Sequence, residues 1–294
     1  MINLGEYSIA LIATDAGAFN QIIFLLENKK IYKVNPCING AALDIWNKSN
    51  KYSRIKQLDL QEAISKSDLV LTGTSFDNKL EHKARLISKK QKKYCISVVD
   101  HWVNYESRFI FNNEKLLPNE IWVFDKYAYD LSKKIFPNTV IQQLKSFYLE
   151  NIVNQIYNRK KDSENLSILY LLEPIRSEWA QDYHGEFIAL DFFITNAYKL
   201  NIFKKNSNIV LKPHPSDEKN KYQSWRELQK GWHISIDDTN NLIYLLNNAD
   251  VVIGCETYAL YIASLANKKV VTSLPLGAPK FKLPIPKIIE LRNL

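Results

Sequence analysis

Short apolar runs alternate with segments of helical periodicity along the first half of the chain. Apolar runs bounded by turn residues are typical of buried strands, whereas apolar residues spaced three or four positions apart are typical of helices. The predicted strands are residues 8–13, 30–34, 68–72, 94–99 and 120–124. Residues 19–26, 81–90 and 126–135 are predicted helices, and residues 41–46 a loop or short helix.

The alternation restarts after the polar window 157–165, which is the best linker candidate. Strands are predicted at 167–172, 208–212, 233–236, 251–253 and 269–272, and helices at 186–198, 222–228, 241–247 and 257–265. Such alternation predicts the α/β class, with a parallel sheet covered by helices on both faces in each half.

We therefore expect two facing Rossmann-like domains, residues 1–158 on the acceptor side and 159–294 on the nucleotide-sugar side. Ligands of such sheets bind at the carboxyl ends of the strands, so the facing domains would share a donor-binding cleft. Residues 282–294 are expected to form a tail that packs near the N-terminal domain.

Composition narrows the possible classes of protein. A hydrophobic fraction of 46% over 294 residues supplies a sizeable core, which excludes global disorder. The longest apolar runs are far shorter than the ~20 residues of a membrane span. The first residues lack a basic segment before an apolar run, so we expect a cytoplasmic protein.

The formal net charge of +8 suggests an anionic partner, but the basic clusters at 89–93 and 159–161 favour a lysine-rich solvated surface instead. A basic stripe with interleaved aromatic residues, as nucleic-acid modules carry, is not seen. The three cysteines, Cys37, Cys95 and Cys255, lie far apart and form no metal-binding pattern.

The strongest local motif is Lys212-Pro213-His214-Pro215, which follows a predicted strand. Each proline fixes its own φ and restricts the residue before it, so the imidazole is pre-organised beside a cation. This arrangement suits the binding or protonation of a leaving phosphate. The alternative, a histidine in a surface turn, is less favoured because the strand and both prolines are present.

A second motif lies at residues 250–260 (DVVIGCETYAL). Gly254 ends a predicted strand and allows close approach of a ligand, and Glu256-Thr257 opens a helix whose free amides favour an anion. Thr257 either donates its hydroxyl to that anion or caps the helix.

Together these motifs, over about 110 residues, resemble the C-terminal domain of GT-B glycosyltransferases. Within that fold they are most similar to the bacterial sialyltransferase, polysialyltransferase and capsular Kdo-transferase group, which uses CMP-activated acidic sugars. The resemblance implies that His214 contacts the donor phosphate, with Lys212 beside it. Paired Ser/Thr hydroxyls bind the phosphate in that group; here Thr257 matches, whereas Glu256 departs from the pattern.

The same resemblance implies a carboxylate that holds the ribose before the intervening helix. Asp237 or Asp238 falls there, or caps the helix predicted at 241–247. Glu173 and Arg176 follow the first strand of the C-terminal half. Arg176 would meet a phosphate or carboxylate, or else pair with Glu178 on the surface.

Candidate chemistry in the N-terminal half follows two strands. Thr14-Asp15-Ala16-Gly17 resembles the acidic triplet that supplies the general base in this group, with its middle acid replaced by alanine. If Asp15 is desolvated, its pKa is raised and it can act as a general base. The alternative is that Asp15 caps the next helix. Asp100, His101 and Trp102 form a second group, suited to an acceptor sugar or else to a core-anchoring tryptophan with a capping aspartate.

The sequence thus predicts an inverting, nucleotide-sugar-dependent glycosyltransferase, with inversion implied by the resemblance. It would move a nonulosonic acid or Kdo from a CMP donor to a glycan or glycolipid hydroxyl in capsule or lipopolysaccharide synthesis. Neither a cofactor nor a metal is expected, since the chain lacks the Asp-x-Asp of GT-A enzymes. Peripheral contact with the inner membrane stays open.

Three alternatives also stay open: a CDP-glycerol or UDP-sugar transferase, a UDP-sugar 2-epimerase, and a catalytically silent nucleotide-binding subunit. The 2-epimerase is less favoured because it would need a fuller set of acidic and histidine groups around the sugar.

Overall fold

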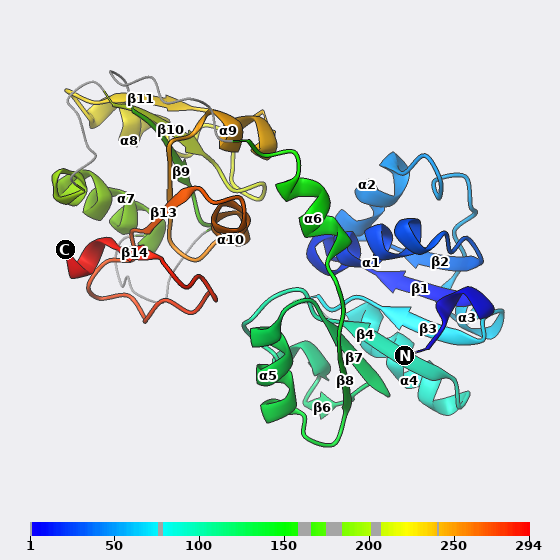
Figure 1. Ribbon diagram of the computed structural model, residues 1–294. Coiled ribbons are helices and arrows are strands. Elements are labelled where there is room, and N and C mark those ends of the chain that lie inside the picture. Colours follow the sequence, from blue (N-terminus) through cyan, green and yellow to red (C-terminus); the bar gives the residue numbers. More distant parts are fainter. Residues whose placement is uncertain (1, 76–78, 158–165, 175–183, 201–206, 240) are drawn as a thin grey trace. The chain divides into compact units, whose positions relative to one another are not determined.

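The computed structural model describes residues 2–75, 79–157, 166–174, 184–200, 207–239 and 241–294. It divides into two compact units, Met1–Glu150 (unit 1) and Asn151–Leu294 (unit 2) (Figure 1). The division lies before the polar window that suggested a boundary after residue 158. Residues 151–157 belong to unit 2 because the Tyr157 amide donates to Asn247 Oδ1 (2.8 Å) and Lys268 Nζ donates to the Tyr157 carbonyl (3.2 Å).

Unit 1 is built on a six-stranded, fully parallel sheet in the order β2-β1-β3-β4-β7-β8. The strands are β1 (Ile9–Ala13), β2 (Val34–Ile38), β3 (Leu69–Thr72), β4 (Tyr94–Val98), β7 (Glu120–Val123) and β8 (Val140–Gln143). A separate antiparallel pair consists of β5 (Ile110–Phe111) and β6 (Glu114–Lys115). The helices are α1 (Ala16–Lys29), α2 (Gly40–Lys48), α3 (Leu60–Ser65), α4 (Lys79–Lys90) and α5 (Lys126–Ile135). A further helix, α6 (Phe147–Val153), contains the division between the two units.

Unit 2 repeats this plan with the sheet order β11-β10-β9-β12-β13-β14, again parallel throughout. Its strands are β9 (Ser167–Leu171), β10 (Asn208–Lys212), β11 (His233–Ile236), β12 (Val251–Gly254), β13 (Lys269–Thr272) and β14 (Ile289–Glu290). Its helices are α7 (Gly185–Asn196), α8 (Gln223–Leu228), α9 (Leu242–Asn248) and α10 (Tyr258–Leu265). The predicted α/β class, with a Rossmann-like sheet in each half, is confirmed.

The strand predicted at residues 30–34 is wrong in its position. Lys30 ends α1 in the left-handed conformation (φ 55°), and the chain turns there before β2 begins at Val34. β2 contains Pro36. The proline is tolerated because β2 is an edge strand. A residue without an amide hydrogen loses no hydrogen bond between strands when that position faces the open edge of the sheet.

The C-terminal tail adds a short strand to unit 2. Ile289 and Glu290 form β14, which pairs with β13 and extends the sheet of unit 2. Leu291 is fully buried in the core of the same unit. The apolar residues of the tail therefore complete the sheet and core of unit 2, and packing of the tail near the N-terminal domain stays a prediction.

Each sheet has a point where the connections leave in opposite directions. In unit 1 this point lies between β1 and β3, since β2 follows on the other side of β1. In unit 2 it lies between β9 and β12, since β10 and β11 lie on the other side of β9. Doubly wound sheets bind their ligands at the carboxyl ends of the strands beside such points.

Candidate functional site

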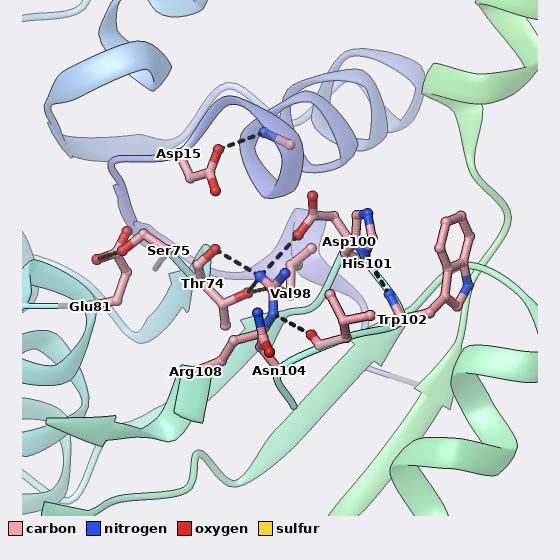
Figure 2. Close-up of polar contacts among 12 residues, drawn as sticks. Asp15, Thr74, Ser75, Glu81, Val98, Asp100, His101, Trp102, Asn104 and Arg108 are labelled. Atoms are coloured by element: carbon pink, nitrogen blue, oxygen red, sulfur yellow. Dashed lines mark hydrogen bonds and ion pairs between the residues drawn. The ribbon is translucent and has the colours of Figure 1, made fainter. Parts of the chain in front are cut away.

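Two aspartates meet at the carboxyl edge of the sheet in unit 1 (Figure 2). Asp15 follows β1 and caps α1, with its Oδ1 accepting the Gly17 amide at 3.2 Å. Asp100 follows β4, and its Oδ2 lies so close to Gly17 that a Cβ added there would sit 1.9 Å away. The capping alternative for Asp15 is confirmed, and the absent side chain of Gly17 lets Asp100 approach the same helix start.

Burial and mutual repulsion act on these carboxyl groups. The pKa of Asp15 is raised, first by burial and then by the negative charge of Asp100. Burial also raises the pKa of Asp100, while the Arg108 guanidinium opposes that shift. Arg108 Nη1 lies 3.4 Å from Asp100 Oδ1, and both side chains are nearly buried, with exposed fractions of 13% and 11%. A carboxyl with a raised pKa is suited to proton transfer near neutral pH.

A buried glutamate fixes the ends of β1 and β3 around this pair. Glu81 on α4 is fully buried and accepts the Thr14 amide (2.9 Å) and the Thr14 hydroxyl (2.6 Å) through Oε1. Its Oε2 accepts the Ser75 hydroxyl at 3.1 Å. Because Thr14 directly precedes Asp15, these bonds hold the backbone that carries the candidate base.

His101 and Trp102 take different positions after β4. Trp102 is buried, and its Nε1 donates to Asp125 Oδ2 (2.8 Å), the residue that caps α5. His101 Nδ1 accepts the Trp102 amide at 3.0 Å. The indole ring has the geometry of a core anchor, one of the two roles considered from the sequence. Asp100 does not cap a helix and lies with Asp15 instead.

His214 lies at the carboxyl edge of unit 2, in a loop tied down by Asp217. The Asp217 carboxylate accepts the His214 amide (2.8 Å), Lys221 Nζ (2.7 Å) and the Tyr222 hydroxyl (3.2 Å). Lys221 Nζ also pairs with the buried Glu186 at 2.7 Å. The two prolines and this buried ionic network together fix the direction of the imidazole.

The local hydrogen bonds also assign the tautomer of His214. The Ser216 amide donates to His214 Nδ1 at 3.2 Å, so Nδ1 is an acceptor and a neutral ring carries its proton on Nε2. Burial lowers the pKa of His214, which favours this neutral form. The ring can therefore donate a hydrogen bond from Nε2 to an anion without first becoming charged.

His214 and Asp238 line one polar cavity of about 330 Å³ at the ends of β10 and β11. Lys212 is the first residue of the motif, and burial lowers the pKa of its ammonium group. Asp237 accepts the Thr239 amide and hydroxyl (2.9 and 2.6 Å). Asn241 caps α9 through the Tyr244 amide, so the capping alternative for the two aspartates is wrong.

Carboxylates surround the start of α10. Buried Glu173, which follows β9, accepts the Glu256 amide at 2.8 Å, and Glu256 Oε1 accepts the Lys282 amide at 2.6 Å. Thr257 caps α10 by accepting the Ala259 amide at 3.2 Å. Carboxylates accept hydrogen bonds from hydroxyl groups and repel phosphate. Arg176 lies outside the described residues.

The described residues contain no group of three or more His, Cys, Asp and Glu placed to hold a metal ion. Over the same part of the chain, no helix has the length and apolar character needed to span a bilayer.

Comparison with solved structures decides the fold. A putative UDP-N-acetylglucosamine 2-epimerase from Listeria monocytogenes is 11% identical over 90% of this chain and 78% of that chain, with a TM-score of 0.60. A complex of S. aureus MnaA with UDP is 13% identical over 90% and 78%, with a TM-score of 0.59. The glycosyltransferase of kitacinnamycin is 12% identical over 98% and 87%, with a TM-score of 0.53. The chain has the GT-B fold.

At identities of 11–13% the likeness is one of fold. None of these three structures is a sialyl- or Kdo-transferase, and no match to this GT-B chain is found among family models or curated proteins.

Sequence reasoning missed the residues of this GT-B chain that hold others in place: Arg108, Thr74, Glu81 and Asp217. Arg108 lies in a loop and Glu81 on a helix, far in sequence from the groups they contact. A signal was available for Asp217 alone, because an aspartate three residues after His214 can accept the amide of the histidine.

Proposed function

We propose that the protein is a nucleotide-sugar-dependent glycosyltransferase. The observation that carries the proposal is that both sheets place reactive groups at their carboxyl edges. Unit 2 offers an oriented neutral imidazole, and unit 1 a pair of nearly buried carboxyl groups. The proposal assigns the donor to unit 2 and the acceptor to unit 1. The GT-B fold supports a nucleotide sugar as the donor, since the similar structures include a complex with UDP.

On the donor side, His214 Nε2 would donate to the phosphate that leaves. Negative charge grows on that phosphate as its bond to the sugar breaks, so the contact strengthens in the transition state. Lys212 would add a positive charge beside it. Glu256, which stands where the resembled group has a hydroxyl residue, would accept hydrogen bonds from ribose or sugar hydroxyls, with Glu173 holding its backbone amide.

On the acceptor side, Asp15 would take the proton of the attacking hydroxyl. The new bond joins that oxygen to the anomeric carbon, the bond from this carbon to the phosphate oxygen breaks, and its electron pair leaves with the phosphate. The proton on Asp15 then passes to solvent. No metal or cofactor is required by this assignment of roles.

The finer proposal concerns the donor. The resemblance of the Lys-Pro-His-Pro motif to that of CMP-sugar-dependent transferases favours a CMP-linked acidic sugar, with a glycan or glycolipid hydroxyl as acceptor. The net charge of +8 is compatible with substrates that carry negative charge.

Thermal unfolding with CMP, CDP, UMP and UDP tests the choice of nucleotide. A ligand that binds the folded state stabilises it by about 2.7 kcal/mol at a hundredfold excess over Kd. Because the proposed donor is linked to CMP, we expect CMP to raise the melting temperature most. His214→Ala should weaken the stabilisation. A larger shift with UDP than with CMP would replace the CMP donor by a UDP donor, and no shift with any of the four would contradict nucleotide binding.

The paired carboxyl groups favour a second candidate, a UDP-sugar 2-epimerase. Inversion at a carbon next to the anomeric centre requires a proton to be removed and another returned, and two neighbouring carboxyl groups can share these tasks. The two candidates differ in product, since a transferase releases the nucleotide and an epimerase returns an isomeric nucleotide sugar.

A further inference from the structure

Asp15 and Asp100 approach the first turn of α1 from two strands. Asp15 Oδ1 accepts the Gly17 amide, and Asp100 Oδ2 packs against the α-carbon of the same glycine. Two carboxyl groups held this close are costly to ionise together, because each negative charge disfavours the other. One of them must therefore retain its proton to a higher pH than its partner.

Arg108 is held so that its charge acts on Asp100. Its Nε donates to the Val103 carbonyl (3.2 Å), and its Nη1 contacts the hydroxyl and carbonyl oxygens of the buried Thr74 (3.2 and 3.4 Å). The same Nη1 lies 3.4 Å from Asp100 Oδ1, as the dashed lines in Figure 2 mark. The oxygens that hold the guanidinium in place are neutral, so they do not cancel its positive charge. That charge therefore stabilises the ionised form of the neighbouring aspartates.

The titratable groups around the pair include two phenols, the His101 imidazole, whose Nδ1 accepts the Trp102 amide, and the Glu81 carboxylate, which holds Thr14. Tyr105 lies near Asp100, Arg108 and Asp125, and Tyr148 on α6 lies near Asp100. Burial raises the pKa of both phenols, so both are neutral at neutral pH. Burial raises the pKa of both carboxyl groups, and the Arg108 charge lowers both, with its direct contact made to Asp100.

We propose that Arg108 is a positioning residue that keeps the negative charge on Asp100, which leaves Asp15 as the carboxyl that exchanges a proton with the acceptor hydroxyl. The inference rests on the proposed function only in naming the acceptor hydroxyl. It selects between the two neighbouring carboxyl groups that could each serve as the base. Burial and the charge of Asp100 raise the pKa of Asp15, which suits Asp15 for proton transfer near neutral pH.

Carbon-detected NMR titration of the aspartate carboxyl groups tests this order without any substrate. Asp15→Asn and Asp100→Asn assign the two signals. In the wild type we expect Asp100 to ionise at a lower pH than Asp15. In Arg108→Gln the titration midpoint of Asp100 should rise. The gap, meaning the difference between the midpoints of Asp15 and Asp100, should then shrink by about one pH unit or more, as for loss of a neighbouring opposite charge.

Two further variants separate charge from structure. Arg108→Lys keeps the positive charge and should restore most of the gap. Arg54→Gln removes the same charge from an exposed position of unit 1 and should leave both midpoints unchanged. Where turnover is measurable, the acid limb of kcat/KM should follow the midpoint of Asp15 in each variant.

The inference is overturned if Asp15 ionises first in the wild type, or if Arg108→Gln leaves the gap unchanged while Arg108→Lys is folded. These outcomes do not depend on the reaction. If the titrations agree with expectation but no nucleotide sugar is turned over, the proposed function fails and with it the acceptor role of Asp15, whereas the placement of charge by Arg108 stands.

Discussion

Replacing His214 with alanine is expected to lower turnover by roughly a hundred- to a thousandfold, the usual cost of losing one oriented donor to developing charge. The melting temperature should change little, because the half-buried ring contributes its hydrogen bonds locally within the loop. The Asp217 network, which does not depend on the imidazole, continues to hold the backbone of the loop. Turnover and thermal unfolding should be measured on the same preparation.

His233→Ala is the matched control for this experiment. His233 is exposed at the start of β11 in the same unit, so its loss should leave both turnover and melting temperature near the wild-type values. A structural role for His214 predicts the opposite pattern, with a lower melting temperature and near-normal turnover in the folded fraction. A folded and fully active His214→Ala protein would remove the donor-side assignment.

Asp15→Asn is expected to lower turnover by roughly a hundred- to ten-thousandfold, the range of general-base contributions. The amide oxygen of asparagine can still accept the Gly17 amide, so the cap of α1 and the stability of unit 1 should persist. In the wild type, activity should fall as the pH drops through the raised pKa of Asp15, because protonation removes the base. The acid limb should therefore lie above the ordinary aspartate pKa of 3.8.

Asp59→Asn provides the control, since Asp59 is an exposed aspartate that caps α3 through the Glu62 amide (2.8 Å). It undergoes the same chemical change at the same kind of position, without a neighbouring carboxyl group in the candidate site. Equal losses in both variants would show that capping, and not base catalysis, explains the effect. Full activity of Asp15→Asn together with a large loss in Asp100→Asn would transfer the base to Asp100.

Much of the fold follows from local patterns. Residues 126–135, 208–212, 233–236 and 269–272 were predicted with the bounds that the structure shows. In these segments an apolar run or helical spacing is bounded by residues that favour turns or caps, so local and tertiary preferences agree. The position of β2 was predicted wrongly, since this edge strand carries Pro36. β14 was not predicted, because it has only two residues.

The site could be predicted only where it follows the strands. Asp15, Asp100, Glu173, His214 and Glu256 all come after a strand end, and the parallel topology brings each to a carboxyl edge. The meeting of Asp15 with Asp100 depends on β1 and β4 being separated by β3 alone, which the sequence does not encode locally. The partners Arg108 and Glu81 were invisible for the same reason, since tertiary packing alone brings them to the aspartates.

The most direct test of the proposed reaction is phosphorus NMR of the wild-type protein incubated with CMP- and UDP-linked sugars. We expect one donor to be cleaved, with a signal of free nucleotide that grows faster when a glycan acceptor is added and grows at least a hundredfold more slowly in His214→Ala. An isomeric nucleotide-sugar signal without free nucleotide would show an epimerase. Donors that all stay intact, in the presence of nucleotide binding, would show a silent subunit and contradict the proposed reaction.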